Sequence, residues 1–163
     1  MRLTGHYQNA YITHDLDKGM ELFKSRFELG EFLVFDPAEL TVQTPRGESP
    51  YSARIATAWA GTLQIELIQP LSGFVDFYRE VLPDDPADVL PRFHHIALRR
   101  PDVSELHRDM AESGMPMVME GAVPGLTFAY LDARPVFGHY IELCTATEEM
   151  WQYNSWPSNK PLA

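Results

Sequence analysis

An internal repeat of 87 residues is the feature that most restricts the fold of this chain. Asp15 and Asp102 are 87 residues apart, and each follows a short apolar segment and can cap the helix that comes next. The apolar helix faces keep the same register, since Phe23 and Met110 are also 87 residues apart. Each half of the chain therefore predicts the order strand, helix and three strands.

Turn-forming residues set the boundaries of these elements. In the first half we expect a strand over 5–13, a helix that ends at Gly30, a strand over 31–35, an irregular segment over 36–51, and a hairpin of 52–60 and 62–69 about Gly61. In the second half we expect a strand over 92–100, a helix that ends at Gly114, and strands over 116–123, 126–134 and 139–146. A helix around 74–82 would connect the halves, and the tail would pack Met150, Trp151 and Trp156 over one edge.

The composition is that of a globular protein with a negative charge. The 163 residues are 45% hydrophobic, enough to bury a core. Thirteen Lys and Arg against 23 Asp and Glu give a net charge of -10, which opposes binding to nucleic acid and to anionic membrane surfaces. Cys144 is the single cysteine, so an internal disulfide and a cysteine metal cluster are excluded. We find no signal peptide or membrane-spanning run and expect a cytoplasmic protein.

Four polar side chains occupy equivalent strand positions in the two halves. Gln8 and His95 each lie seven residues before a capping aspartate, and Glu66 and Glu142 each lie in the sequence Ile-Glu-Leu. Taken singly, these residues have ordinary explanations, such as a carboxylate in solvent or a hydrogen-bonded structural histidine. Their coincidence favours a site for a divalent metal ion that is bound by oxygen and nitrogen atoms.

The same residues resemble the vicinal oxygen chelate superfamily, which includes glyoxalases, methylmalonyl-CoA epimerases, extradiol dioxygenases and bleomycin-resistance proteins. The resemblance covers roughly residues 4–146 and is carried by QNAYITHDL (8–16), IELIQP (65–70), FHHIALRRPDV (93–103) and GHYIEL (138–143). It implies an α+β fold, in which two tandem βαβββ modules form a curled mixed sheet with an open cup. The modules would span about 4–70 and 91–146 of a single domain, with a connecting helix at about 73–83 and a tail over 147–163.

The resemblance also implies a reaction class. Gln8, Glu66, His95 and Glu142 would hold a divalent ion on the floor of the cup, and Zn, Ni, Co, Mn or Fe would each suit such ligands. The ligand order is similar to one type of glyoxalase I. We expect a lyase, isomerase or epimerase that abstracts a proton next to the carbonyl of a small acid or thioester, through a metal-bound enediolate or enolate, with Glu66 or Glu142 as the base.

Two positions depart from the named enzymes of the superfamily. Ile12, four residues after Gln8, stands where glyoxalase I has an arginine that helps to hold glutathione. The segment 52–60 has no acidic residue, although the epimerase is expected to carry a second catalytic acid there. The sequence therefore predicts a reaction class and no particular substrate.

Four further side chains are candidates for binding a small-molecule substrate. His6 shares the strand face of Gln8, and Arg54 would suit a carboxylate or phosphate if it faced inward. Phe128 and Tyr130 share one face of their strand and would line the cup. The alternatives are that His6 caps the strand in solvent, that Arg54 faces solvent, and that the two aromatic residues pack in the core.

Other functions stay open. One is a non-catalytic cup that binds a small molecule, as in the antibiotic-resistance relatives. Another is a ring-cleaving dioxygenase, whose site of two histidines and one carboxylate would need His6 as well as His95. A third is an interaction domain that uses the tail sequence MWQYNSW. We also expect a homodimer, and the sequence leaves open whether the cup closes within one chain or between two.

Overall fold

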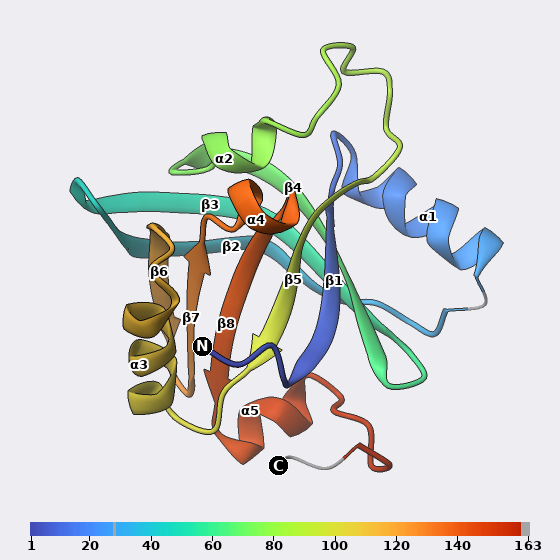
Figure 1. Ribbon diagram of the computed structural model, residues 1–163. Coiled ribbons are helices and arrows are strands. Elements are labelled where there is room, and N and C mark those ends of the chain that lie inside the picture. The colour runs from blue at the N-terminus through green and yellow to red at the C-terminus, as the bar shows by residue number, and fades with distance from the viewer. Residues whose placement is uncertain (28, 161–163) are drawn as a thin grey trace.

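Eight strands form one mixed sheet that curls into a closed barrel in the computed structural model, which describes residues 1–27 and 29–160 (Figure 1). The strands are β1 (His6–Ile12), β2 (Leu33–Thr44), β3 (Gly47–Ala60), β4 (Leu63–Gly73), β5 (Arg92–Arg99), β6 (Met117–Val123), β7 (Leu126–Leu131) and β8 (Tyr140–Ala146). The helices are α1 (Leu16–Arg26), α2 (Asp76–Arg79), α3 (Val103–Ser113), α4 (Arg134–Phe137) and α5 (Glu148–Tyr153). In the described part of the chain, no helix has the length and apolar character that crossing a membrane requires.

The first half of the chain has the order strand, helix, three strands, and the second half has the same order with the single turn of α4 between β7 and β8. Asp15 and Asp102 cap α1 and α3, and their side chains accept hydrogen bonds from the backbone N–H groups of Lys18 (3.1 Å) and Glu105 (2.8 Å). These bonds satisfy N–H groups that have no partner within the first helical turn. The two helices lie outside the barrel, on opposite sides of it in Figure 1.

The sheet is mixed, as expected, but it closes further than the predicted open cup. β1 pairs in parallel with β4, and β5 pairs in parallel with β8, whereas β1 and β5 are antiparallel. The ring closes where β2 meets β6, at the pairs Val42–Gly121 and Gln43–Glu120. The open cup is therefore corrected to a closed barrel, because β2 extends far enough to reach β6.

Residues 36–51 are the part of the first half that the prediction described wrongly. They were expected to be irregular because they are rich in Pro, Gly, Thr and Ser, but they complete β2 and begin β3, which form a long hairpin. Pro37 lies where the pairing of the two strands shifts, between Phe35 and Ala38. A proline at such an irregularity costs no ladder hydrogen bond, so the strands continue past it.

The segment between the halves also differs from prediction. The helix expected over 74–82 is limited to the single turn of α2, which begins without a side-chain cap. Phe77 and Tyr78 of this turn are buried in the main hydrophobic cluster of the barrel. The segment therefore contributes to the core more than it serves as a connection.

The tail closes one end of the barrel, below the strands in Figure 1. Trp151 and Trp156 are buried, and their rings contact Tyr7 of β1 at centroid distances of 5.3 and 5.6 Å. The indole N–H of Trp59 donates to the carbonyl of Asn154 at 2.8 Å. The packing expected of the tail tryptophans is therefore present.

We expect Gly121→Ala to destabilise the protein. Gly121 of β6 pairs with Phe128 of β7, and a Cβ atom added to Gly121 would lie 2.4 Å from Phe128 Cζ, so the ring would have to move. Urea denaturation should show a free energy of unfolding that is lower by about 1–3 kcal/mol. Gly30→Ala is the control, because a Cβ atom there meets nothing within 4 Å. Equal losses in both variants would contradict the explanation.

Candidate metal centre

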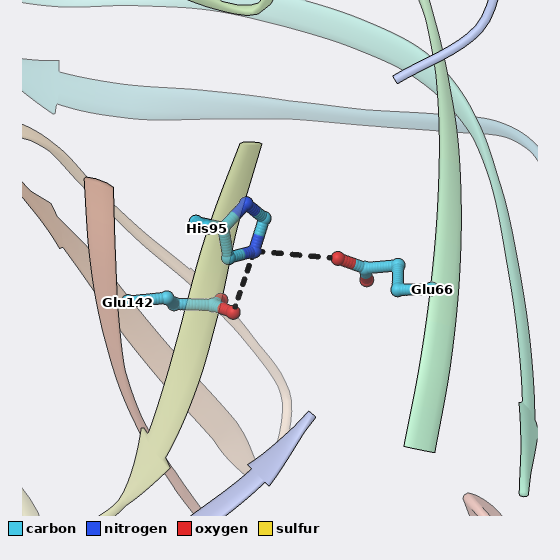
Figure 2. A group of neighbouring side chains, drawn as sticks. All are labelled: Glu66, His95 and Glu142. Carbon is cyan, nitrogen blue, oxygen red and sulfur yellow. Dashed lines mark ion pairs between the residues drawn. The ribbon is translucent and has the colours of Figure 1, made fainter. Parts of the chain in front are cut away.

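Glu66, His95 and Glu142 converge inside the barrel (Figure 2). His95 Nε2 lies 3.5 Å from Glu66 Oε2 and 3.4 Å from Glu142 Oε2. Potential ligand atoms of the three residues all lie within 4.8 Å of one another. His95 is completely buried, and the two glutamates are 9% and 8% exposed. The structure thus brings together three of the four ligands predicted from the sequence.

Strand pairing explains why these residues meet. Ala10 of β1 pairs with Glu66 of β4 on one side and with His95 of β5 on the other. Ala97, two residues after His95, pairs with Glu142 of β8. Paired residues of neighbouring strands share a face of the sheet, and the alanine methyl groups leave space for the larger side chains to converge.

Gln8, the fourth predicted ligand, lines the same cavity as Glu66 and Glu142. Its Nε2 donates to Gln64 Oε1 at 2.8 Å, and its Oε1 is buried with no hydrogen-bond partner among the described residues. Glu66 Oε2 makes the ion pair with His95 but is also buried without a hydrogen bond. Buried oxygen atoms of this kind are rare unless they bind something. With the imidazole they make an oxygen and nitrogen set that fits a divalent metal ion.

An irregularity in β5 turns two consecutive histidines toward each other. The pairing of β5 with β1 skips His94, between Phe93 and His95. His94 Nε2 lies 3.1 Å from the carbonyl oxygen of Phe77, to which it can only donate. His94 Nδ1 is therefore the acceptor for the proton on His95 Nδ1, 3.0 Å away. This hydrogen bond orients the ring of His95 so that Nε2 faces the two carboxylates.

The two histidines differ in protonation state, because the pKa of His95 is raised and that of His94 is lowered. Burial alone would lower the pKa of His95, but the ion-pair contacts with Glu142 and Glu66 raise it to about 9. Burial, together with the charge of His95, holds the pKa of His94 well below its usual value. Burial raises the pKa of Glu142, and the charge of His95 opposes this rise. Near neutral pH, a protonated His95 thus lies between the carboxyl groups of Glu66 and Glu142 and beside a neutral imidazole.

The centre forms part of the wall of a cavity of about 220 Å³, whose lining is mostly aromatic and aliphatic. Phe128 and Tyr130, two of the four predicted substrate contacts, both line it. Tyr130 Oη lies 3.3 Å from His95 Nε2 and accepts a hydrogen bond from the hydroxyl of Tyr78 at 3.0 Å. The position expected of these two aromatic residues is therefore observed, and their contact with a substrate stays a prediction.

Arg54 lies away from this cavity, so the prediction that it binds substrate is corrected. Its guanidinium makes ion pairs with Asp17 (3.1 Å) and with Asp36 (2.8 Å). Side chains alternate along β3, and the neighbouring Ile55 lines the cavity instead. The two carboxylates therefore hold Arg54 on the opposite face, between α1 and the start of β2.

His6 also lies outside the cavity, which corrects the prediction that it contacts substrate. Its side chain is exposed at the start of β1, and its Nε2 lies 2.9 Å from Asn9 Oδ1. The pairing of β1 with β5 is irregular between His6 and Gln8, so the two residues do not share a face as strict alternation would require. The alternative that His6 caps the strand in solvent fits this position.

The sequence analysis missed His94 and two tyrosines near the centre. Strict alternation would place His94 on the face opposite His95, and apart from the histidine pair itself nothing in the sequence indicates the irregular pairing that overrides it. Tyr51 and Tyr78 come from segments that were expected to be an irregular excursion and a connecting helix. The hydroxyl of Tyr51 donates to that of Tyr78 at 3.4 Å, which extends the chain of hydroxyl groups that ends at Tyr130.

We expect His94 and His95 to have different protonation states in metal-free protein at about pH 7.5. Because its pKa is raised to about 9, His95 should remain doubly protonated, whereas His94 should be neutral with its proton on Nε2. Long-range ¹H–¹⁵N correlation spectra measure both states. Glu142→Gln removes one neighbouring negative charge and should lower the pKa of His95. A His95 that titrates near the ordinary value of about 6.5 would contradict this account.

Residues 7–130 match the family model described as the Glyoxalase/Bleomycin resistance protein/Dioxygenase superfamily. A search of curated protein sequences finds no match. Several solved structures are similar to this one at low identity, which shows a shared fold.

One similar solved structure is that of the hypothetical protein BH1468 from Bacillus halodurans C-125. It has 19% identity and a TM-score of 0.62, over 90% of this chain and 97% of that chain. Methylmalonyl-CoA epimerase from Mycobacterium tuberculosis has 15% identity and a TM-score of 0.60, over 93% and 96% of the two chains. A variant of Streptomyces coelicolor methylmalonyl-CoA epimerase, in complex with 2-nitronate-propionyl-CoA, has 21% identity and a TM-score of 0.62, over 90% and 97%. The family resemblance inferred from the sequence is confirmed, and the chain belongs to the Glyoxalase/Bleomycin resistance protein/Dioxygenase superfamily.

Proposed function

We propose that this protein is a metal-dependent isomerase or epimerase that moves a proton at the carbon next to a carbonyl group. The observation that carries the proposal is the buried group of Glu66, His95 and Glu142 in contact with a cavity. Membership of the superfamily and the similarity to methylmalonyl-CoA epimerases support a reaction of this class.

The donor set suits a divalent ion held by Gln8, Glu66, His95 and Glu142. The two carboxylates would balance its charge once His95 Nε2 gives up its proton, so the buried centre would be neutral overall. When bound, such an ion supplies a Lewis acid that stabilises negative charge on a substrate oxygen. The hydrogen bond to His94 keeps the lone pair of His95 Nε2 directed into the centre.

We assign the proton transfers to Glu66 and Glu142. Both carboxylates line the cavity, and they come from opposite halves of the chain. Burial raises the pKa of Glu142, which makes its carboxylate a stronger base than an exposed one. The residues of β3 that line the cavity, such as Ile55 and Thr57, carry no carboxylate, so acid and base would both come from this pair.

The proton transfer can be followed by deuterium exchange. We expect the wild-type protein, loaded with metal, to catalyse solvent deuterium incorporation next to the carbonyl of a suitable ketone or aldehyde, measured by ¹H NMR. Glu142→Gln should lower this rate by about 10²–10⁴-fold, because it removes a general base while keeping the shape of the side chain. Glu120→Gln, in a half-buried glutamate that does not line the cavity, is the matched control. Full activity in Glu142→Gln would disprove the assignment.

Metal content tests the centre itself. Protein purified without chelator or affinity-column metal should contain about one equivalent of a divalent transition metal by elemental analysis, and His95→Ala and Glu142→Ala should lose it. His94→Phe keeps the ligands but removes the hydrogen bond to His95, so we expect metal affinity to fall by about 10–100-fold. Wild-type protein that holds no metal, and shows no thermal shift with Zn, Ni, Co, Mn or Fe, would refute the proposal.

The aromatic lining of the cavity favours a second candidate function, the binding of a small molecule without turnover. Tight binding that needs no metal, without any deuterium exchange, would favour this candidate. A ring-cleaving dioxygenase would need two histidine ligands. His95 is the only histidine of the centre among the described residues, and His6 lies outside the cavity, so this function is less well supported. Dimer formation stays a prediction from the family resemblance.

A further inference from the structure

We propose that the cavity binds an electrically neutral substrate with an apolar body the size of one ring, and that it does not accept a free carboxylate or phosphate group. This inference rests on the proposed function and narrows its substrate class, since an acid was among the substrates expected from the sequence.

The described wall of the cavity carries two acidic side chains and no basic one. Apart from Glu66 and Glu142, its described lining consists of aromatic, aliphatic and uncharged polar side chains. Arg99, at the end of β5, lies over the rings of Trp151 and Trp156, at 5.7 and 5.9 Å, and is not part of the lining. The wall therefore offers no cationic side chain to an anionic substrate.

The charge balance of the centre likewise disfavours an anion. With a divalent ion bound, Glu66 and Glu142 would neutralise it, and without one, the centre contributes carboxyl groups and no cationic side chain to the cavity wall. In neither state is there positive charge left over for a substrate anion. An uncompensated charge in a site of low polarity is strongly disfavoured, whereas a neutral carbonyl or hydroxyl group is not.

The Tyr130 hydroxyl is an uncharged hydrogen-bond donor beside the centre. Tyr51 donates to Tyr78, and Tyr78 donates to Tyr130, so among the described residues the only acceptor near the hydroxyl proton of Tyr130 is His95 Nε2, which a bound metal ion would occupy. Tyr130 Oη lies 3.3 Å from His95 Nε2, next to the centre. A neutral donor in that position suits a carbonyl or hydroxyl oxygen, and apolar neighbours such as Phe128 suit the rest of the molecule.

Size and the character of the opening add to these arguments. A cavity of about 220 Å³ exceeds the ~150 Å³ that accommodates benzene, which leaves room for a ring and a short oxygenated substituent. Val123 and Tyr153 line the cavity and are 41% and 60% exposed, so they lie at its opening. Tyr153 ends α5, whose first turn carries the exposed Glu148 and Glu149.

A matched pair of probes tests the inference. 2-Hydroxyacetophenone and mandelate both carry a phenyl ring and two vicinal oxygen functions, but only mandelate is charged at neutral pH. Isothermal titration calorimetry with zinc-loaded and with metal-free protein should give binding of 2-hydroxyacetophenone that is at least about tenfold tighter than binding of mandelate. Equal or tighter binding of mandelate, or binding of neither probe, would overturn the inference.

The two probes and the metal content together distinguish a failure of this inference from a failure of the proposed function. If the protein holds one equivalent of metal but prefers mandelate, the metal centre stands and the substrate class is wrong. If it holds no metal but still prefers 2-hydroxyacetophenone, the proposed reaction fails and the substrate class stands.

A variant with an added charge provides a second test. Leu40→Arg places a cation in the cavity lining, and Leu40→Met is the matched control of similar length without charge. We expect Leu40→Arg to tighten mandelate binding by about tenfold and Leu40→Met to leave it unchanged. Circular dichroism and metal content establish that both variants are folded. Unchanged mandelate affinity in folded Leu40→Arg would overturn the argument from charge.

Discussion

Two buried carboxylates beside one buried imidazole are the arrangement on which the rest of this structure depends. Ionisable groups removed from water are costly unless each finds a partner, and here one imidazolium serves both Glu66 and Glu142. Strand pairing around Ala10 and Ala97 holds the three side chains together whatever their charge. The barrel therefore holds two acidic side chains beside a single imidazole, and a divalent cation bound there would balance the negative charge of Glu66 and Glu142.

The surroundings of His95 extend this arrangement well beyond the three residues. The ring is fixed by His94, which is fixed in turn by the carbonyl group of Phe77 in α2. This explains why the short segment between the two halves is buried and not a loose connection. Tyr78, from the same turn, supplies the hydroxyl that bonds to Tyr130. One turn of helix thus supports both the metal centre and the adjacent cavity wall.

Glu66, His95 and Glu142 could be predicted from the sequence because they occupy equivalent positions in the 87-residue repeat. The alternation of side chains within β4 and β8 also holds in the structure. The prediction failed where alternation is interrupted, at His6 and at His94, since an irregularity in strand pairing moves a side chain to another face without changing the sequence pattern. It failed for Arg54 for a different reason. The direction of that side chain is set by Asp17 and Asp36, and their proximity arises only when α1 packs against the folded sheet.

The apolar lining of the cavity affects both the basicity of the centre and the kind of substrate that can bind beside it. Apolar side chains such as Phe128 line the cavity beside the centre, and burial, which removes Glu142 from water, raises the pKa of its carboxyl group. It also strengthens every electrostatic interaction between the centre and whatever oxygen atom reaches it. A wall that excludes water equally excludes a substrate that brings its own uncompensated charge. In the proposed reaction, the basicity of Glu142 and the preference for a neutral substrate would therefore have one physical origin.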